Sequence, residues 1–275
     1  RLPFGIAQMG KAFRNEITPG NFIFRTREFE QMEIEYFVRE NEWETQFAYW
    51  QNEMNSWIRD LGIDMSHVHE TEIPDGEREH YSKRTIDFEY DYPFGRKELY
   101  GLAYRTDFDL RNHFKEAPYR DPDPPAGGQA EFWPHVIEPT WGVDRSVLVV
   151  LVDCYREEGD GGKKRVYLKL PPKLAPYQVA VFPLLANKPP LVEKAQNVFS
   201  SLFHVPCSMF HVAWDDRGNI GKRYYAQDEI GTPWCVTVDF QTLEDDTVTV
   251  RDRDTAAQER VPVGELEAYF SARLQ

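Results

Sequence analysis

FRNEI at residues 13–17, followed after a short connection by FRTREFEQME at residues 24–33, is the stretch that decides the fold. In the first segment the residues alternate, which is typical of a strand and places Arg14 and Glu16 on one face. The connection contains Thr18-Pro19-Gly20-Asn21, residue types that favour a turn. The two segments therefore predict an antiparallel hairpin whose return strand starts near Phe24.

The side chains of this hairpin suit a nucleotide. Arg14, Arg25 and Arg27 offer planar, permanently charged guanidinium groups that match phosphate oxygens. Phe29 offers an aromatic face on which a base can stack. The hairpin is therefore a candidate ATP site. A charged surface hairpin, with Glu and Arg paired across its strands, accounts for the same charges equally well.

Two motifs in sequence order favour the ATP site. The pattern of residues 13–16 (FRNE) and 27–30 (REFE) is similar to the second signature motif of class II aminoacyl-tRNA synthetases, and residues 29–37 (FEQMEIEYF) resemble the glycyl branch of that family. Residues 135–145 (HVIEPTWGVDR) resemble its third motif, and the likeness continues through residues 106–110 into the C-terminal third. The resemblance implies an α+β fold, with an antiparallel-sheet catalytic core, and a glycine-tRNA ligase that uses ATP.

The resemblance also implies which residues do what. Arg14 would hold the α-phosphate, Arg145 would grip ATP from the other side, and Phe29 would stack on adenine; Arg14 and Arg145 are the implied catalytic residues. The implied ATP-binding residues are Arg14, Asn15, Glu16, Phe24, Arg25, Thr26, Arg27, Glu28, Phe29, Glu98, Leu99, Gly142, Val143, Asp144 and Arg145. Magnesium would come with ATP, with Glu98 as a carboxylate ligand, and no site built from protein groups alone is expected.

Glycine has no side chain, so its recognition must combine capture of the ammonium with walls that exclude larger amino acids. The resemblance assigns Glu33 and Glu138 to the ammonium and Thr140 to a neighbouring polar contact. The implied glycine-binding residues are Phe29, Glu30, Gln31, Met32, Glu33, Glu138, Pro139, Thr140, Trp141 and Gly142. The family usually has Ser where this chain has Thr140, and Phe or a smaller residue where it has Trp141. The sequence therefore does not decide the volume of the pocket near Trp141.

Composition narrows the class of protein. The chain has 275 residues, of which 41% are hydrophobic and 28% charged, as in ordinary globular proteins with room for two domains. The longest apolar run, residues 147–152, is too short to span a membrane. Three distant cysteines without a CxxC pair indicate neither a disulfide framework nor a thiolate zinc site. A cytoplasmic protein without a membrane partner is expected.

The net charge is −14, which disfavours non-specific binding to nucleic acid and to DNA in particular. The acidic excess is uneven, with 22 basic and 32 acidic residues before Pro171 but 10 and 14 from there onward. An enzyme that reads a folded RNA needs only a local basic face. Charge is therefore compatible with the tRNA(Gly) partner that the resemblance implies.

The chain opens at Arg1 and reaches the nucleotide motif almost at once. Proteins of the resembling family carry a long N-terminal portion, whose first motif builds a homodimer interface and starts the catalytic sheet. We therefore expect a fragment that exposes a strand edge and apolar area, and that makes little adenylate alone. A non-catalytic tRNA-binding or regulatory paralogue is the alternative.

In the front part the clearest predicted helix spans residues 41–61, with an apolar stripe at intervals of three and four and Asn41 as its cap. Residues 64–84 read as loop, 86–92 as a strand and 118–128 as a Pro/Gly-rich loop. Residues 147–152 favour a strand by β-branching, whereas the resemblance implies a helix. His67 and His69 lack a third metal ligand, and residues 5–12 lack the Ser or Thr of a phosphate loop.

The second part begins after a proline-rich linker. The predicted domains are residues 1–172, a partial catalytic domain, and residues 173–275, which resemble the anticodon-binding domain of glycyl, histidyl, prolyl and threonyl synthetases. Strands at 178–183, 210–214, 235–240 and 247–252 alternate with helices at 191–203, 220–230 and 264–274, which favours a small α/β domain. Residues 218–223 and 251–254 are candidates for tRNA contact, with a surface ion-pair cluster as the equal alternative.

Overall fold

A computed structural model describes residues 1–121, 131–159, 164–203 and 211–274. The chain divides into two compact units, Arg1–Asp153 and Cys154–Gln275, and each is treated by itself. The sequence places the domain boundary after residue 172. The boundary lies earlier, after Asp153, because the hairpin of β9 (Tyr155–Glu158) and β10 (Arg165–Leu168) contacts helix α5 (Ile220–Ile230) and so belongs to the second unit.

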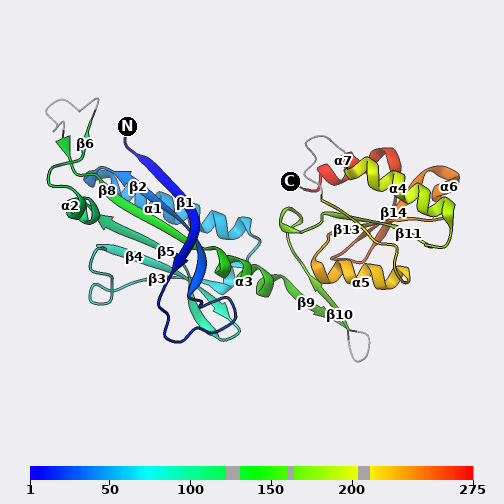
Figure 1. Cartoon of the computed structure of the whole chain (residues 1–275), viewed down its shortest axis with the longest axis horizontal. Coiled ribbons are helices and arrows are strands. Elements are labelled where there is room, and N and C mark those ends of the chain that lie inside the picture. Colours follow the sequence, from blue (N-terminus) through cyan, green and yellow to red (C-terminus); the bar gives the residue numbers. More distant parts are fainter. Residues whose placement is uncertain (122–130, 160–163, 204–210, 275) are drawn as a thin grey trace. The chain divides into compact units, whose positions relative to one another are not determined.

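The first unit is built on a six-stranded sheet in which every neighbouring pair is antiparallel, as predicted (Figure 1). Its order is β1-β2-β8-β5-β4-β3. The strands are β1 (Phe4–Phe13), β2 (Glu28–Val38), β3 (Val68–Glu72), β4 (Arg84–Tyr92), β5 (Gly95–Thr106) and β8 (His135–Gly142). β1 is an edge strand whose Ile6 and Met9 side chains are 59% and 68% exposed, so an exposed apolar edge is present.

The hairpin differs from the prediction in where its strands lie. β1 ends at Phe13 and β2 begins at Glu28, so residues 14–17 and 24–27 belong to the connecting loop. One further bond, from the Arg14 amide to the Arg27 carbonyl at 3.0 Å, extends the ladder. Beyond it the continuous ladder stops, and an isolated antiparallel bridge between Gly20 and Arg25 closes the loop tip, where Asn21 takes a left-handed conformation (φ 55°). Residues 5–12 are strand, and not a phosphate loop.

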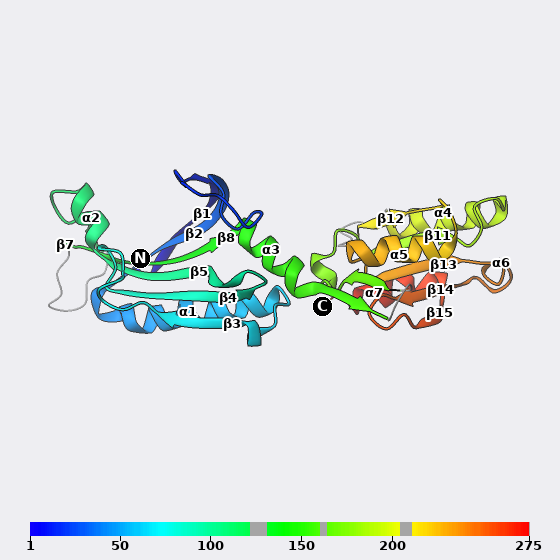
Figure 2. The same cartoon turned by 90° about the horizontal axis from the view of Figure 1, so that it is seen from below.

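Helix α1 (Trp43–Asp60) runs along one face of this sheet (Figure 2) and contacts β5 and β8. Its apolar stripe buries Phe47, Met54 and Ile58 against the strands. The helix starts later than predicted, because residues 40–42 form a 3-10 turn and Glu42 occupies the N-cap without a side-chain bond. The opposite face of the sheet is therefore free to carry polar groups.

The remaining elements of the first unit are η1 (Glu40–Glu42), η2 (Met65–His67), α2 (Phe108–His113), β6 (Tyr119–Arg120), β7 (Glu131–Phe132) and α3 (Val143–Cys154). The helix implied at residues 147–152 is confirmed by α3. The predicted loop at 64–84 was wrong in part, because it contains the short, polar edge strand β3. Of the predicted loop at 118–128, residues 122–128 lie outside the described residues.

The second unit holds a mixed five-stranded sheet in the order β12-β11-β13-β14-β15, which confirms the predicted α/β domain. Helices α4 and α7 cover one face and α5 covers the other (Figure 1). Sequence patterns missed the four-residue α6 and the edge strand β15. The elements not yet given are η3 (Pro172–Leu174), β11 (Val179–Pro183), α4 (Pro189–Phe203), β12 (Val212–Trp214), β13 (Trp234–Val238), α6 (Thr242–Asp245), β14 (Thr247–Asp252), β15 (Gln258–Pro262), η4 (Val263–Glu265) and α7 (Leu266–Ser271).

Within the described ranges, no helix combines the length and the apolar character needed to cross a lipid bilayer.

Candidate active site

A pocket opens on the sheet face opposite α1, at the end where β2 and β5 begin and β8 ends. The loop before β2 and the first turn of α3 complete its walls. Its lining residues are Arg14, Glu16, Ile23, Phe24, Arg25, Thr26, Phe29, Glu30, Gln31, Glu98, Leu99, Tyr100, Gly101, Thr140, Gly142, Asp144 and Arg145. Segments more than a hundred residues apart in sequence thus meet at one site.

Arg145 is fixed at the start of α3. Its Nη1 donates to the Glu98 carbonyl at 3.0 Å and lies 3.1 Å from the Glu98 carboxylate. Its Nε donates to the Phe24 carbonyl at 3.3 Å, and the guanidinium carbon lies 4.4 Å from the centre of the Phe24 ring. Asp144 accepts a bond from the Glu30 amide at 2.7 Å, which joins the first turn of α3 to β2. The Arg145 guanidinium is therefore held at the pocket wall.

The Arg14 side chain is held by fewer contacts than that of Arg145. Its side chain is exposed, and its guanidinium carbon lies 5.4 Å from the centre of the Phe29 ring. Within the described part of the chain, no acceptor lies within bonding distance of this guanidinium. Arg25 lies 4.0 Å from the Glu16 carboxylate, at the limit of an ion pair. An incoming anion would meet the Arg14 charge without displacing a protein carboxylate.

The structure brings most of the predicted ATP residues together but not all of them. Those outside the lining are Asn15, Arg27, Glu28 and Val143. The Arg27 Nε donates to the Glu16 carbonyl at 3.0 Å, and Glu28 pairs with Lys11 on β1. The Arg27 and Glu28 side chains therefore support the loop, since their partners are other parts of the hairpin.

A cluster of carboxylates continues along the same polar face. Glu33 lies opposite Thr140 in the β2–β8 ladder and accepts a bond from the Gln31 amide at 2.6 Å. Glu138 pairs with Arg105 of β5, whose Nη1 lies 2.5 Å from its Oε2. Burial raises the pKa of Glu138, and Arg105 opposes the rise. The two glutamates implied for glycine thus lie on one face, with Thr140 beside Glu33.

Four groups near this cluster were missed by the sequence analysis. Arg105 also binds Asp109 of α2 through two bonds of 2.7 and 2.8 Å, and these bonds lower the pKa of Asp109. Burial and then the Glu138 carboxylate raise the pKa of Glu35 to about 7. Burial and then Glu98 raise the pKa of Asp87 on β4 to about 6. The sequence does place Glu35 two residues after Glu33, on the same face of a strand, and this spacing was the one available signal for Glu35.

The side chains of Met32 and Trp141 do not reach this face, which corrects their predicted place in the glycine pocket. Both pack against the core on the α1 side, where Trp141 contacts the rings of Trp50 and Trp57. The reason is the alternation of side chains along a strand, which also turns Pro139 away. The bulk of Trp141 therefore does not restrict the pocket.

The two histidines are held separately. His67 lies 2.7 Å from Asp153, and His69 lies 2.7 Å from Asp91. No group of three or more His, Cys, Asp and Glu residues in the described ranges is arranged to hold a metal ion.

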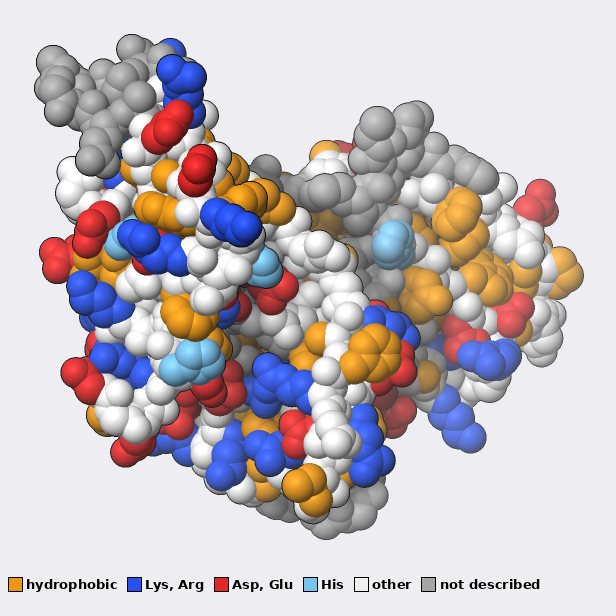
Figure 3. Space-filling model, turned by 60° about the vertical axis from the view of Figure 1, so that its left-hand side comes forward, with side chains coloured by type: hydrophobic (Ala, Val, Ile, Leu, Met, Phe, Trp, Pro, Cys, Tyr) orange, Lys and Arg blue, Asp and Glu red, His pale blue; other side chains and the backbone are white. Residues whose placement is uncertain are grey.

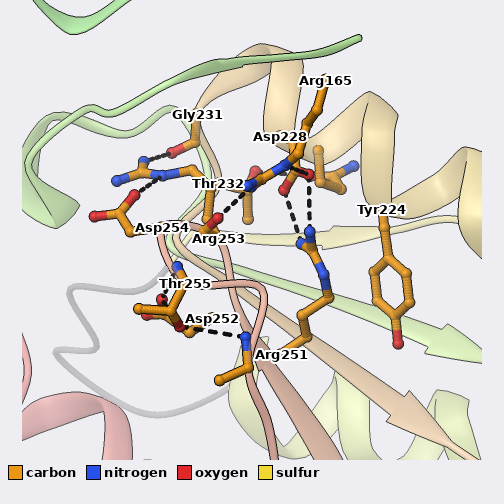
Figure 4. A network of polar contacts seen from close by, with 12 residues as sticks. Arg165, Tyr224, Asp228, Gly231, Thr232, Arg251, Asp252, Arg253, Asp254 and Thr255 are labelled. Atoms are coloured by element: carbon orange, nitrogen blue, oxygen red, sulfur yellow. Dashed lines mark hydrogen bonds and ion pairs between the residues drawn. The ribbon is translucent and has the colours of Figure 1, made fainter. Parts of the chain in front are cut away.

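The basic residues proposed for tRNA contact in the second unit are mostly buried, which corrects that interpretation. Arg223, Arg251 and Arg253 are 2%, 6% and 3% exposed. Arg251 makes two bonds to Asp228, at 2.8 and 3.0 Å, and Arg253 donates to the carbonyls of Gly231 and Leu170 (Figure 4). The alternative of a surface ion-pair cluster is also wrong, because the pair with Asp228 is internal.

Lys222 remains exposed within residues 218–223. On the face shown in Figure 3, acidic and basic side chains are interspersed. The negative net charge is thus not a uniform negative surface there, and a local basic contact with an RNA is compatible with it.

Both compact parts of the chain match known protein domains. Residues 1–153 match the tRNA synthetase class II core domain (G, H, P, S and T), and residues 178–273 match an anticodon binding domain. Relatives named glycine–tRNA ligase are 47% identical in Clostridium acetobutylicum, 48% in Thermobifida fusca and 46% in Thermus thermophilus, each over the whole of this chain. The chain spans 58%, 60% and 59% of the length of these relatives.

Proposed function

The chain belongs to the class II tRNA synthetases, and from that premise we propose that the whole protein joins glycine to its transfer RNA. In the first step the glycine carboxylate attacks the α-phosphorus of ATP, and pyrophosphate leaves. In the second step a hydroxyl of the terminal ribose of the tRNA attacks the glycyl carbonyl, and AMP leaves. The observation that carries the proposal is the pocket that joins Arg14, Phe29 and Arg145 to Thr140, which lies opposite Glu33 in the β2–β8 ladder.

ATP fits the part of this pocket nearest the loop. Phe29 would stack on adenine, and Arg145 would close the other side of the nucleotide. Arg14 would pair with the α-phosphate and stabilise the charge that develops there as the phosphorus is attacked. Its exposed guanidinium supports this role, since an arginine already paired to a carboxylate would bind phosphate less well.

Glycine fits the adjoining polar face. Glu33 and Glu138 would bind its ammonium, and the Thr140 hydroxyl would contact the remainder of the amino acid. Arg105 supports this assignment, because it holds the Glu138 carboxylate in place through an ion pair of 2.5 Å. Glu33 has no basic partner among the described residues, so the substrate ammonium would be its only cation.

Magnesium would enter with ATP. Glu98 fits as a ligand, because its carboxylate lines the pocket and is about half exposed. The rest of the coordination would come from phosphate oxygens and water, the usual pattern for this ion. When bound, the ion would neutralise phosphate charge.

The partners follow from the same proposal. The domain matched at residues 178–273 would bind the anticodon of tRNA(Gly), and the whole protein would form a homodimer in the cytoplasm. Lys222 is the exposed cation that we retain as a candidate RNA contact. Buried Cys154 and Cys235 thiols are compatible with a reducing compartment.

Glycine-dependent exchange of labelled pyrophosphate into ATP, measured on the full-length protein, tests the proposal. Exchange with glycine, and none with alanine or serine, is the expected result. Binding of tRNA without any exchange would overturn the enzymatic proposal in favour of the non-catalytic tRNA-binding paralogue.

A further inference from the structure

The polar face of the first sheet holds more carboxylates than cations. Glu33 and Glu35 come from β2, Glu138 from β8 and Asp109 from α2, while Arg105 of β5 is the basic group at their centre. Arg105 is fully committed, since its Nε and Nη2 bind Asp109 and its Nη1 binds Glu138. The four carboxylates thus share one guanidinium.

Glu35 is the carboxylate with the least support. The register that pairs Glu33 with Thr140 and Tyr36 with Ile137 sets Glu35 opposite Glu138. In the described ranges, no hydrogen bond or ion pair reaches its carboxylate, although it is partly buried. Ala103 is the next residue across the sheet beyond Glu138, and its methyl group offers no donor.

The charges around Glu35 come from β2, β8, β5 and α2, while β1 places the apolar Ile6 opposite it. Glu33 on its own strand, Glu138 on β8 and Asp109 on α2 disfavour its ionised form, and Arg105 on β5 favours it. Burial is the largest effect, and together these raise the pKa of Glu35 to about 7. The group therefore titrates near neutrality in the empty pocket.

Resting on the proposed function, we propose that Glu35 is the proton-exchanging group of the amino-acid pocket. It carries a proton when the pocket is empty and releases it to solvent when the glycine ammonium binds beside Glu33 and Glu138. One positive charge enters and one leaves, so the charge of the cluster is unchanged. The physical cause is that a nearby cation favours the ionised form of a carboxyl group.

The direction of the pH effect follows. Below pH 7 glycine must displace a proton, so its affinity should be weaker there and should rise as the pH rises through 7. With one linked proton, the dissociation constant should fall about tenfold between pH 6 and pH 8. Without such a group the affinity would be flat over this range.

Isothermal titration of glycine into the full-length protein at pH 6, 7 and 8 tests this. Two buffers that differ in ionisation enthalpy give the number of protons released. The wild type should release up to one proton per glycine and show the tenfold change. Glu35→Gln should bind glycine with neither effect, and Glu35→Asp should restore both in part. Glu53→Gln, the same change on the exposed surface of α1, should behave as the wild type.

A wild type that binds glycine without proton release would overturn the inference and leave the proposed function standing. This measurement uses the wild type alone, so it tests the inference even if Glu35→Gln fails to fold. An unchanged pH slope in Glu35→Gln would also overturn it. Absence of glycine binding at every pH would remove the proposed function and the inference together.

Discussion

Each unit of the molecule contains a cluster of arginine and carboxylate groups, and the two clusters differ in whether their charges are matched. In the second unit Asp228 is fully buried and accepts bonds from both Arg251 and Arg165. Arg253 uses its donors on Asp254 and two backbone carbonyls. Figure 4 shows these side chains turned toward one another, between the hairpin strand β10, helix α5 and strand β14.

In the first unit the cluster is open. Arg105 bonds to Glu138 and Asp109, while Glu33 and Glu35 form no ion pair with a basic side chain among the described residues. The difference separates two uses of buried charge. A network whose donors and acceptors are all satisfied holds elements together, whereas an unmatched excess of one sign is suited to bind a charged substrate.

The largest effect is expected from breaking the closed cluster. Asp228→Asn leaves the buried Arg251 without its counter-charge and removes one of the two carboxylates that pair with Arg165, so the second unit should lose about 3–5 kcal/mol of unfolding free energy. Amide hydrogen exchange in α5 and β14 measures the loss. Asp246→Asn is the matched control, because Asp246 forms an exposed pair with Lys194 and should change stability by less than about 1 kcal/mol. Equal effects in the two variants would contradict the distinction.

The next effect concerns catalysis at the open side. Arg14→Ala removes a cation that should bind the α-phosphate most strongly in the transition state, at a cost of about 3 kcal/mol or more. The value of kcat/KM for pyrophosphate exchange should then fall more than about a hundredfold. Arg59→Ala, on the exposed surface of α1, is the control. Normal exchange by Arg14→Ala would remove Arg14 from the phosphate site.

Local patterns predicted much of the fold. The alternation in residues 29–37 is that of a strand, which β2 confirms, and the apolar stripe of α1 predicted its packing face. β1 was missed because residues 5–12 contain two glycines and a single β-branched residue, and strand propensity there is weak. The helix α3 came from the family resemblance, since Val and Leu alone favour a strand.

The site was predicted where its residues share a motif and missed where distant strands meet. Arg105, Asp109 and Glu35 join Glu138 only through the register of three strands and the position of α2, which no local pattern encodes. The assignment of Arg251 and Arg253 to tRNA contact was wrong for a related reason. Charged residues are usually exposed, but Arg251 is paired with Asp228 on a helix 23 residues away in sequence, and Arg253 donates to the carbonyls of Gly231 and Leu170.

A smaller effect should sharpen the open cluster itself. Glu33→Gln keeps the size of the side chain but removes the charge that would pair with the substrate ammonium. The KM for glycine should rise about tenfold, which corresponds to about 1.4 kcal/mol, while the KM for ATP should change little. Steady-state exchange kinetics measure both constants, with Glu53→Gln as the charge control. An unchanged KM for glycine would place Glu33 outside the pocket.

The smallest effect has the opposite sign to that of Asp228→Asn. Folding raises the pKa of Glu35 from its ordinary 4.5 to about 7, so ionised Glu35 costs stability in the empty pocket. The neutral form of Glu35 avoids this cost. Its favourable contribution to the free energy of unfolding is fully present below pH 4.5 and is lost as the pH rises through 7. Glu35→Gln, which stays neutral, should therefore match the wild type near pH 4.5 and be more stable at pH 8, by roughly 1 kcal/mol after allowance for solvent screening. Hydrogen exchange in β2 and β8 at the two pH values measures the difference. A loss of stability at pH 8 would mean that Glu35 has a structural partner and that the open cluster is closed after all.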